Sequence, residues 1–309
     1  MSVGADAPTP NKRWKPDTAV GRSQERLAWL LVSPSLFVVL IVAVYPLFET
    51  FRLSFTNKRL ASARETVYVG LDNYRILFDD RIFREAFLNT VTFTVTTVFI
   101  ELVLGMIIAL TIHSNFRGRG AVRASMLIPW AIPTVVSATM WQWMYHDVFG
   151  VINDLLVNRL NILDEKVAWL ANPDTALWAI IAVDVWKTTP FMTLLLLAGL
   201  QLVPGDVYEA ATVDGASKWK QFWGITLPLL KPAVLVALIF RTLDAFRVFD
   251  IVYVMKKYAT DTMTLAVYTQ RETLEKAKIG FGSASAVIIF LSIALFVVIY
   301  TQLIRAEEM

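Results

Sequence analysis

Charged residues fall within two otherwise apolar stretches, and they are the first candidates for chemistry in this chain. A charge at the centre of a bilayer costs at least about 2.5–3.5 kcal/mol, so such residues are expected to face a protein interior and to pair. Part of the second stretch alternates in sign at every third position, which keeps opposite charges adjacent on one helical face. The residues are Asp184 and Lys187 in the first stretch and Arg241, Asp244, Arg247 and Asp250 in the second.

Two interpretations of these charges stay open. They could line a path for a hydroxyl-rich substrate, with aromatic rings stacking on sugar rings; the rings concerned are Trp186, Phe191, Phe246 and Phe249. They could instead form an interhelical lattice of salt bridges. Arg247 or Asp250, near a helix end, could also extend to the membrane interface. Glu101, in another apolar stretch, is interpreted as structural or as the partner of another charge.

Other chemistries find no support in the sequence. The chain has no Cys, and its two His residues, His113 and His146, are far apart, so no metal site is expected. No nucleophile is paired with a base, which argues against a membrane-embedded enzyme. A Gly-x-x-x-x-Gly-Lys-Ser/Thr phosphate loop is missing too, so any ATP must be hydrolysed by another protein.

The composition indicates a membrane protein. Of the 309 residues, 56% are hydrophobic, against roughly 45–50% in soluble domains. The net charge is only +3, and the basic residues lie between apolar spans, so no nucleic-acid surface is indicated.

Six apolar segments are each long enough to cross about 30 Å of hydrocarbon. Residues 1–26 are predicted to be a disordered basic tail, residues 27–305 the transmembrane domain, and residues 306–309 a C-terminal tail. A cleaved signal peptide is the rival interpretation of the N-terminus, but the first apolar run exceeds the usual 7–15 residues of such a signal. The segments run from about 27 to 51, 89 to 112, 124 to 145, 176 to 201, 229 to 255 and 281 to 304.

The distribution of basic residues favours a cytoplasmic N-terminus. Raw counts of Lys and Arg on the two sides are similar, but the tail and a cluster at Arg117, Arg119 and Arg123 lie on the same side. Six spans then place both termini and the loop at 202–228 in the cytoplasm of a multi-pass membrane protein. The long outer loops, 52–88 and 146–175, are either simple connectors or a landing surface for a binding protein; the first is expected to form a small structured cap.

The 202–228 loop predicts a helix, a turn and a second helix. Asp214-Gly215 is a strong turn signal, because Gly adopts positive φ freely. Trp219, Phe222 and Trp223 give the second helix an apolar face. The element is either a docking surface for a partner or an amphipathic helix lying in the headgroup layer.

The same loop closely resembles the EAA loop of ABC-importer permeases, whose pattern is Glu-Ala-Ala, three residues to Asp-Gly-Ala, then Phe and Leu-Pro. The resemblance covers about residues 27–305 and is nearest to maltose-type sugar permeases. Further matching positions are Pro129 and Pro133 in the third span, Trp141, Gly150, Asn153 and Leu156, Trp186, Pro190 and Phe191 in the fourth span, and Leu200, Gln201 and Pro204. The loop positions themselves are Glu209, Ala210, Ala211, Asp214, Gly215, Ala216, Phe222, Leu227 and Pro228.

The resemblance implies a type I ABC importer permease: an all-α membrane protein of six transmembrane helices with a cytoplasmic coupling helix at about 203–228. Such a chain is a non-catalytic subunit that carries a sugar, here a di- or oligosaccharide, by alternating access. It binds no cofactor, and ATP and Mg²⁺ are used by a dimeric ATPase partner. Its other partners are a second permease subunit, expected to be a different chain, an extracytoplasmic sugar-binding protein, and membrane lipid.

The resemblance also implies site residues. Glu209 is expected to contact the ATPase, with the alanines permitting close packing and Gly215 forming the bend. The candidate substrate path consists of Asp184, Trp186, Thr188, Phe191, Asp244, Phe246, Arg247 and Asp250.

The loop after the fifth span departs from the family pattern. Where the family usually has a Gly-Gly-Pro turn after the fifth span, this chain reads Lys256-Lys257-Tyr258-Ala259-Thr260-Asp261, so that loop cannot be transferred. An ion-coupled secondary transporter is the alternative function, since it too would place Asp and Arg in its spans. It would need no docking loop, however, and the internal symmetry of many such folds is not visible here.

Overall fold

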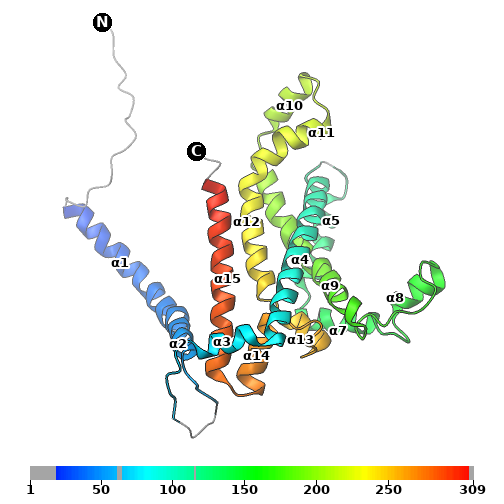
Figure 1. The fold of residues 1–309 in the computed structure, drawn as a ribbon. Coiled ribbons are helices and arrows are strands. Elements are labelled where there is room, and N and C mark those ends of the chain that lie inside the picture. The colour runs from blue at the N-terminus through cyan, green and yellow to red at the C-terminus, as the bar shows by residue number, and fades with distance from the viewer. Residues whose placement is uncertain (1–18, 61–64, 115, 306–309) are drawn as a thin grey trace. The chain divides into compact units, whose positions relative to one another are not determined.

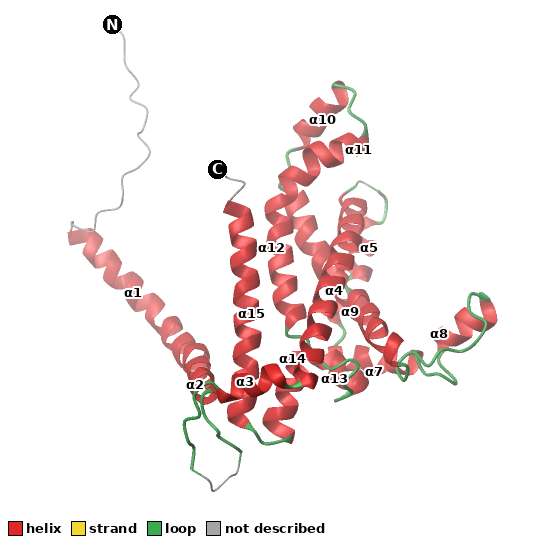
Figure 2. Ribbon diagram, viewed as in Figure 1, coloured by secondary structure: helices red, strands yellow, loops and turns green. Residues whose placement is uncertain are grey.

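The computed structural model describes residues 19–60, 65–114 and 116–305. Figure 2 shows that this part of the chain is helical, and within it the only β pairing is an isolated bridge between Thr56 and Tyr68. The all-α prediction is therefore confirmed. The chain divides into two compact units, residues 1–52 and 53–309. Of the predicted tails, residues 1–18 and 306–309 lie outside the described residues, whereas helix α1 already begins at Ala19.

From Ala19 onward, the first unit is one continuous helical segment. It contains α1 (Ala19–Val39), a π-helical turn η1 (Leu40–Val44) and most of α2 (Tyr45–Ser54). The π-helical turn ends two residues before Pro46, which has no N–H to donate to the preceding turn. Residues Glu25–Ser54 are long and apolar enough to cross a membrane.

The second unit holds the remaining helices, and three of them form its centre (Figure 1). Helices α4, α9 and α12 all pack against one another, and α15 packs against α12. The elements are α3 (Asp72–Asp79), α4 (Arg81–His113), α5 (Arg119–Met126), α6 (Ile128–Ala131), α7 (Thr134–Met144), α8 (Val151–Asn153), η2 (Asp154–Arg159), α9 (Pro173–Leu200), α10 (Gly205–Val213), α11 (Lys218–Gln221), η3 (Phe222–Thr226), α12 (Leu227–Phe246), α13 (Asp250–Lys256), α14 (Leu265–Gln270), η4 (Arg271–Glu275) and α15 (Ile279–Arg305).

Two glycines allow the central helices to approach closely. A Cβ on Gly105 of α4 would lie 2.8 Å from Met192 Cγ of α9. A Cβ on Gly199 of α9 would lie 2.4 Å from the Cβ of Ala233 on α12. Small residues at such crossings are typical of membrane helix packing, where van der Waals contact drives association. The two longest central helices also have capped N-termini, because Asp80 accepts from Ile82 N at 2.8 Å and Asn172 from Asp174 N at 3.0 Å.

The predicted six spans correspond to five long apolar helices and one broken pair. In the described residues the candidates are Glu25–Ser54, Arg81–His113, Pro173–Leu200, Lys218–Lys256 and Ile279–Gln302. The third predicted span, 124–145, is not a single helix: Arg119–Ala131 and Thr134–Met144 meet at 89°. Ile132 between them is extended, with φ −70° and ψ 131°, the conformation that a following proline favours.

The helix ends of the second unit gather at two opposite sides (Figure 1). Helices α10 and α11 lie at one side, and α3, α13 and α14 at the other. The long loops on the latter side are ordered by buried asparagines. Asn73 donates to the carbonyls of Ser54 and Thr56 at 2.8 and 2.9 Å. Asn153 accepts from Val167 N and from the Trp169 indole at 3.1 and 2.9 Å.

Candidate functional site

A buried arginine joins the three central helices. Arg241 of α12 is 2% exposed at its side chain, and its guanidinium donates to the carboxylates of Glu101 on α4 and Asp184 on α9. A second guanidinium nitrogen bonds Glu101 Oε1 at 2.9 Å, and a third bonds Asp244, one turn along α12, at 3.1 Å. The planar fork of arginine suits several carboxylates at once. This network pairs four of the charges in the apolar stretches: Arg241, Glu101, Asp184 and Asp244.

A hydroxyl completes the network. Thr188 Oγ1 on α9 contacts both the Glu101 carboxylate and, at 2.6 Å, the backbone carbonyl of Asp184. Glu101 and Asp184 are buried, whereas the Asp244 side chain is 62% exposed. Two acids are thus enclosed with one arginine, and the third acid faces open space. Asp244 is therefore the acid of the network that can meet a ligand.

Two cavities adjoin the network. One of about 250 Å³ is bounded by aromatic rings, and Trp130 and Phe191 stack there with centroids 6.1 Å apart and 14° between their planes. Another of about 210 Å³ lies beside α13 and includes Asp184, Asp250 and Lys187. The two share the side chains Thr188, Arg241, Asp244 and Arg247. Donors, acceptors and flat apolar rings thus surround one intramembrane space.

Most residues of the predicted substrate path line these cavities. They are Asp184, Thr188, Phe191, Asp244, Arg247 and Asp250. Trp186 and Phe246 do not line either cavity. Trp186 packs edge-on against Trp141 with centroids 5.4 Å apart. Phe246 is 1% exposed in the core and packs against Phe87 and Phe296.

Lys187 connects the cavity to the break in the third span. Its Nζ donates to the carbonyl of Ile132 at 2.6 Å and to that of Trp130 at 3.4 Å. These carbonyls end the short helix α6, where the following backbone turns away and Pro133 supplies no N–H. The lysine side chain is buried, being 7% exposed. Its hydrogen bonds therefore satisfy two carbonyl groups that would otherwise be unpaired inside a membrane.

The predicted helix–turn–helix forms at the other end of the second unit. Helix α10 ends at Val213, and Gly215 has φ +76°, a conformation that other residues adopt at a cost. Nothing lies within 4 Å of a Cβ built on Gly215, so its backbone conformation, and not space, favours glycine. Ser217 then caps α11 by accepting from Lys220 N at 3.4 Å.

The loop keeps its shape through two polar side chains that the sequence analysis did not single out. Gln221 is 3% exposed, and its amide donates to Thr212 Oγ1 and Ala216 O at 3.0 and 3.1 Å. Tyr208 bonds Thr226 through their hydroxyls at 2.9 Å. Gln221 and Tyr208 lie within or next to the motif. A polar residue on the inner side of two helices joined by a turn is the sequence feature that could have indicated their role.

The motif residues themselves are mostly exposed. Glu209, Ala210, Asp214, Gly215 and Pro228 are exposed, and Ala211, Ala216 and Phe222 are half-buried. An acidic side chain and small alanines on one short helix can admit another protein closely. The two helices therefore present an exposed surface, the α10–α11 surface, and the buried Gln221 amide ties them together.

The sequence analysis also missed Trp130 and Phe240, which line the ring-bounded cavity. Trp130 lies between Pro129 and Pro133, so the doubled proline was a signal that its backbone departs from a regular span. Phe240 carried no distinguishing signal among the apolar residues of α12.

Comparisons with known proteins agree with this arrangement. Over residues 101–307 the chain matches the family described as "Binding-protein-dependent transport system inner membrane component". It is 42% identical to the trehalose/maltose transport system permease protein MalF of Thermococcus litoralis, covering 91% of this chain and 95% of the relative. It is 41% identical to the sulfoquinovosyl glycerol transport system permease protein SmoG of Agrobacterium fabrum, covering 91% of each.

A solved structure shares the fold. A chain of a bacterial alginate ABC transporter, in complex with an alginate pentasaccharide-bound periplasmic protein, superposes with a TM-score of 0.80 at 23% identity. The match covers 92% of this chain and 96% of that chain. The fold prediction is thereby confirmed. The relatives are named as permease proteins of transport systems, which agrees with the predicted non-catalytic transport subunit.

Proposed function

This chain belongs to the family of binding-protein-dependent transport system inner membrane components, and we propose that it is one permease subunit of an ATP-driven sugar importer. It is accordingly a multi-pass membrane protein. Its substrate is a di- or oligosaccharide that a separate extracytoplasmic protein delivers. ATP and Mg²⁺ are used by a dimeric ATPase partner, and this chain binds no cofactor.

The intramembrane space beside Arg241 is the observation that carries the sugar assignment. Sugar hydroxyls need both acceptors and donors, and Asp244, Arg247 and Thr188 supply them within one space. The stacked rings of Trp130 and Phe191 offer a flat apolar face to a sugar ring. The relatives named for trehalose, maltose and sulfoquinovosyl glycerol transport support the same substrate class.

The α10–α11 surface is the contact with the ATPase in this proposal. Its exposed Glu209 meets a basic side chain of that partner, and the alanines allow close packing. ATP-driven closure of the ATPase dimer moves this surface, and α12, which follows directly through η3, carries the motion to Arg241. A rigid helix with one end at each site is a suitable mechanical link.

Six spans provide half of a translocation pathway, so a second permease subunit, a different chain, completes it. Both termini and the α10–α11 surface face the cytoplasm in this proposal. The basic residues near the N-terminus and the cluster at Arg117, Arg119 and Arg123 support that orientation. The loops at the opposite side receive the sugar-loaded binding protein.

Reconstitution of the complete transporter in proteoliposomes tests the substrate class. We expect ATP-dependent uptake of one or more members of a disaccharide panel, and Asp244→Asn should raise the half-saturating sugar concentration about tenfold, because a hydrogen bond to a charged group contributes about 1.5–3 kcal/mol. Asp79→Asn, at an exposed carboxylate outside the cavities, is the matched control. Unchanged saturation in Asp244→Asn would remove the cavity from the substrate path.

The same vesicles distinguish the secondary transporter. With ATP maintained inside, collapse of the proton gradient should leave uptake running. Immediate loss of uptake would favour ion coupling instead.

A further inference from the structure

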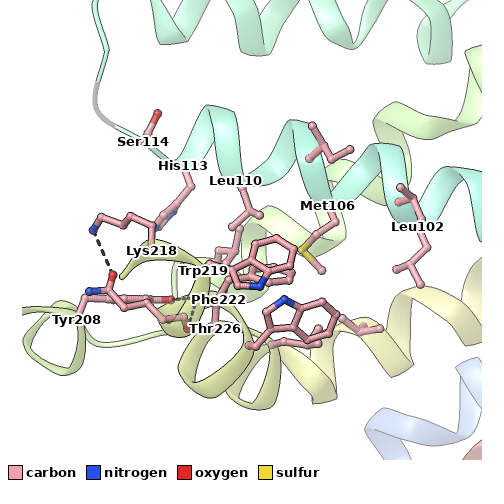
Figure 3. A pocket seen from close by; sticks show the side chains of 17 residues that line it. Leu102, Met106, Leu110, His113, Ser114, Tyr208, Lys218, Trp219, Phe222 and Thr226 are labelled. Atoms are coloured by element: carbon pink, nitrogen blue, oxygen red, sulfur yellow. Dashed lines mark hydrogen bonds between the residues drawn. The ribbon is translucent and has the colours of Figure 1, made fainter. Parts of the chain in front are cut away.

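A second, larger cavity lies between α4 and the segment α11–η3, away from the intramembrane network. Its volume is about 980 Å³, and Figure 3 shows side chains of α4 along one wall and the aromatic residues of α11 and η3 along the other. The α4 wall extends from Leu102 to His113, about 16 Å at 1.5 Å per residue, and Ser114 follows it. The sugar path does not use this space, and the exposed Glu209 of the proposed ATPase contact does not line it.

The two ends of the cavity differ in chemistry. Toward Leu102 and Met106 the α4 wall is apolar and belongs to a membrane-spanning helix. At the other end Figure 3 places His113, Ser114 and Lys218 together. Lys218 Nζ bonds Gln221 Oε1 at 3.1 Å and keeps two further N–H donors. The cavity therefore passes from hydrocarbon-like to cationic along its length.

Two exposed indoles line this space along α11 and η3. Trp219 and Trp223 are 70% and 53% exposed, and their rings pack edge-on with centroids 5.7 Å apart. Tryptophan concentrates at the level of lipid headgroups, because its ring is apolar and its N–H is polar. The indoles therefore place the cationic end at the membrane interface and the Leu102 end within the hydrocarbon.

From this gradient we propose that the cavity is a binding site for an anionic phospholipid. One acyl chain lies along Leu102, Met106 and Leu110, and the phosphate lies at Lys218 with His113 beside it. A helix of the second permease subunit is the competing occupant. Lys218 is exposed at one end of an otherwise apolar channel. A phosphate there would pair with its ammonium, whereas an apolar helix would bring no anion to it.

The site bears on coupling because of where the lipid lies. It fills the space between α4 and α11–η3, and the cavity is also lined by Tyr208, the neighbour of Glu209 on α10. The inference concerns a lipid and is independent of which sugar is carried. Its readout is binding, so its failure would leave the proposed transport function intact.

The test uses the complete transporter in nanodiscs that contain phosphatidylglycerol or phosphatidylcholine brominated on the acyl chain. Bromine quenches the fluorescence of nearby indoles. The part of the quenching that is lost in Trp219→Phe is the signal assigned to this site. We expect brominated phosphatidylglycerol to quench this component at a lower mole fraction than brominated phosphatidylcholine. Lys218→Gln should reduce that preference about fivefold, since a basic residue at an anionic membrane contributes on the order of 1 kcal/mol.

Lys220→Gln is the matched control, because it removes the same charge from the same helix but does not line the cavity. Met106→Phe narrows the apolar end and should weaken quenching by both lipids. Equal quenching by the two lipids in the unaltered protein, or an equal effect of Lys218→Gln and Lys220→Gln, would overturn the proposal. So would protection of Trp219 from both lipids in the complete transporter but not in the isolated chain, which would identify a partner helix as the occupant.

Discussion

The intramembrane network and the α10–α11 surface both contain carboxylate side chains, but the two regions place them in opposite surroundings. At Arg241 the charged groups Glu101 and Asp184 are buried, and each is bonded by a residue of another helix. At the surface, Glu209 and Asp214 are exposed, and the shape is kept by Gln221 behind them. Water satisfies an exposed carboxylate, whereas a membrane interior provides no such alternative.

Substitutions in the two regions should therefore have different effects, on stability at the network and on the proposed coupling at the α10–α11 surface. Removing one member of the buried network leaves other charges without a partner, so the cost falls on the folded state. Removing an exposed side chain of the α10–α11 surface is expected to leave the fold intact and, under the proposed function, to weaken the contact with the ATPase. The predictions below test this difference, in order of decreasing effect on stability.

Arg241→Met should have the largest effect. It leaves Glu101 and Asp184 buried without their cation, and breaking a buried ion pair by removing one partner costs about 3–5 kcal/mol. Denaturation of the purified protein in mixed micelles would measure the change in unfolding free energy. Arg247→Met, the same change at an exposed residue next to α12, should cost far less. Equal losses in the two variants would contradict a special role for the network.

Lys187→Met should come second. It frees the carbonyls of Ile132 and Trp130 at the break of the third span, and hydrogen bonds to charged groups contribute about 1.5–3 kcal/mol. Hydrogen exchange should rise in residues 128–136 before it rises elsewhere. Lys187→Arg should keep most of the protection, and Lys220→Met at the surface should change nothing there. Uniform exchange across the chain in Lys187→Met would show that the lysine has no local role.

The two regions also differ in how well the sequence predicts them. The α10–α11 surface depends on local sequence: an Asp-Gly turn between two short helices can be predicted from adjacent residues, and Gly215 has the positive φ that the turn requires. The network is not local. Charges in apolar spans predict that partners exist, but Glu101 and Arg241 are 140 residues apart, and only the packing of α4 against α12 brings them together.

It was harder still to predict which side of an apolar helix is buried and where such a helix is interrupted. Phe240 and Phe246 are alike in sequence, yet Phe240 lines a cavity and Phe246 lies in the core, because the neighbouring helices decide which side of α12 is covered. The sequence analysis predicts the third span as one segment, from about 124 to 145, with no break in it. At the 89° break the carbonyl of Ile132 accepts from Lys187, which lies 55 residues further along the chain.

Gly215→Ala should have a smaller effect on stability, confined to the loop. A left-handed conformation costs a residue with a Cβ roughly 1–2 kcal/mol, and there is no steric clash to add. Gly224→Ala is the matched control, since it also has open space around it but does not have a positive φ. Hydrogen exchange of residues 205–221 should increase only in Gly215→Ala. Gly215→Asn should lie between the two, because Asn tolerates positive φ better than Ala.

Glu209→Gln should barely change stability, within about 0.5 kcal/mol, because the side chain is exposed. Its effect should appear only in the assembled transporter, where loss of one charge pair weakens ATPase association about tenfold, equivalent to about 1.4 kcal/mol. Asp206→Asn, an exposed acid at the start of the same helix, is the control. Co-purification of the ATPase and ATP-dependent uptake measure the outcome. If Glu209→Gln instead unfolded the chain while leaving ATPase binding intact, the surface would be structural, and the contrast with Arg241 would be lost.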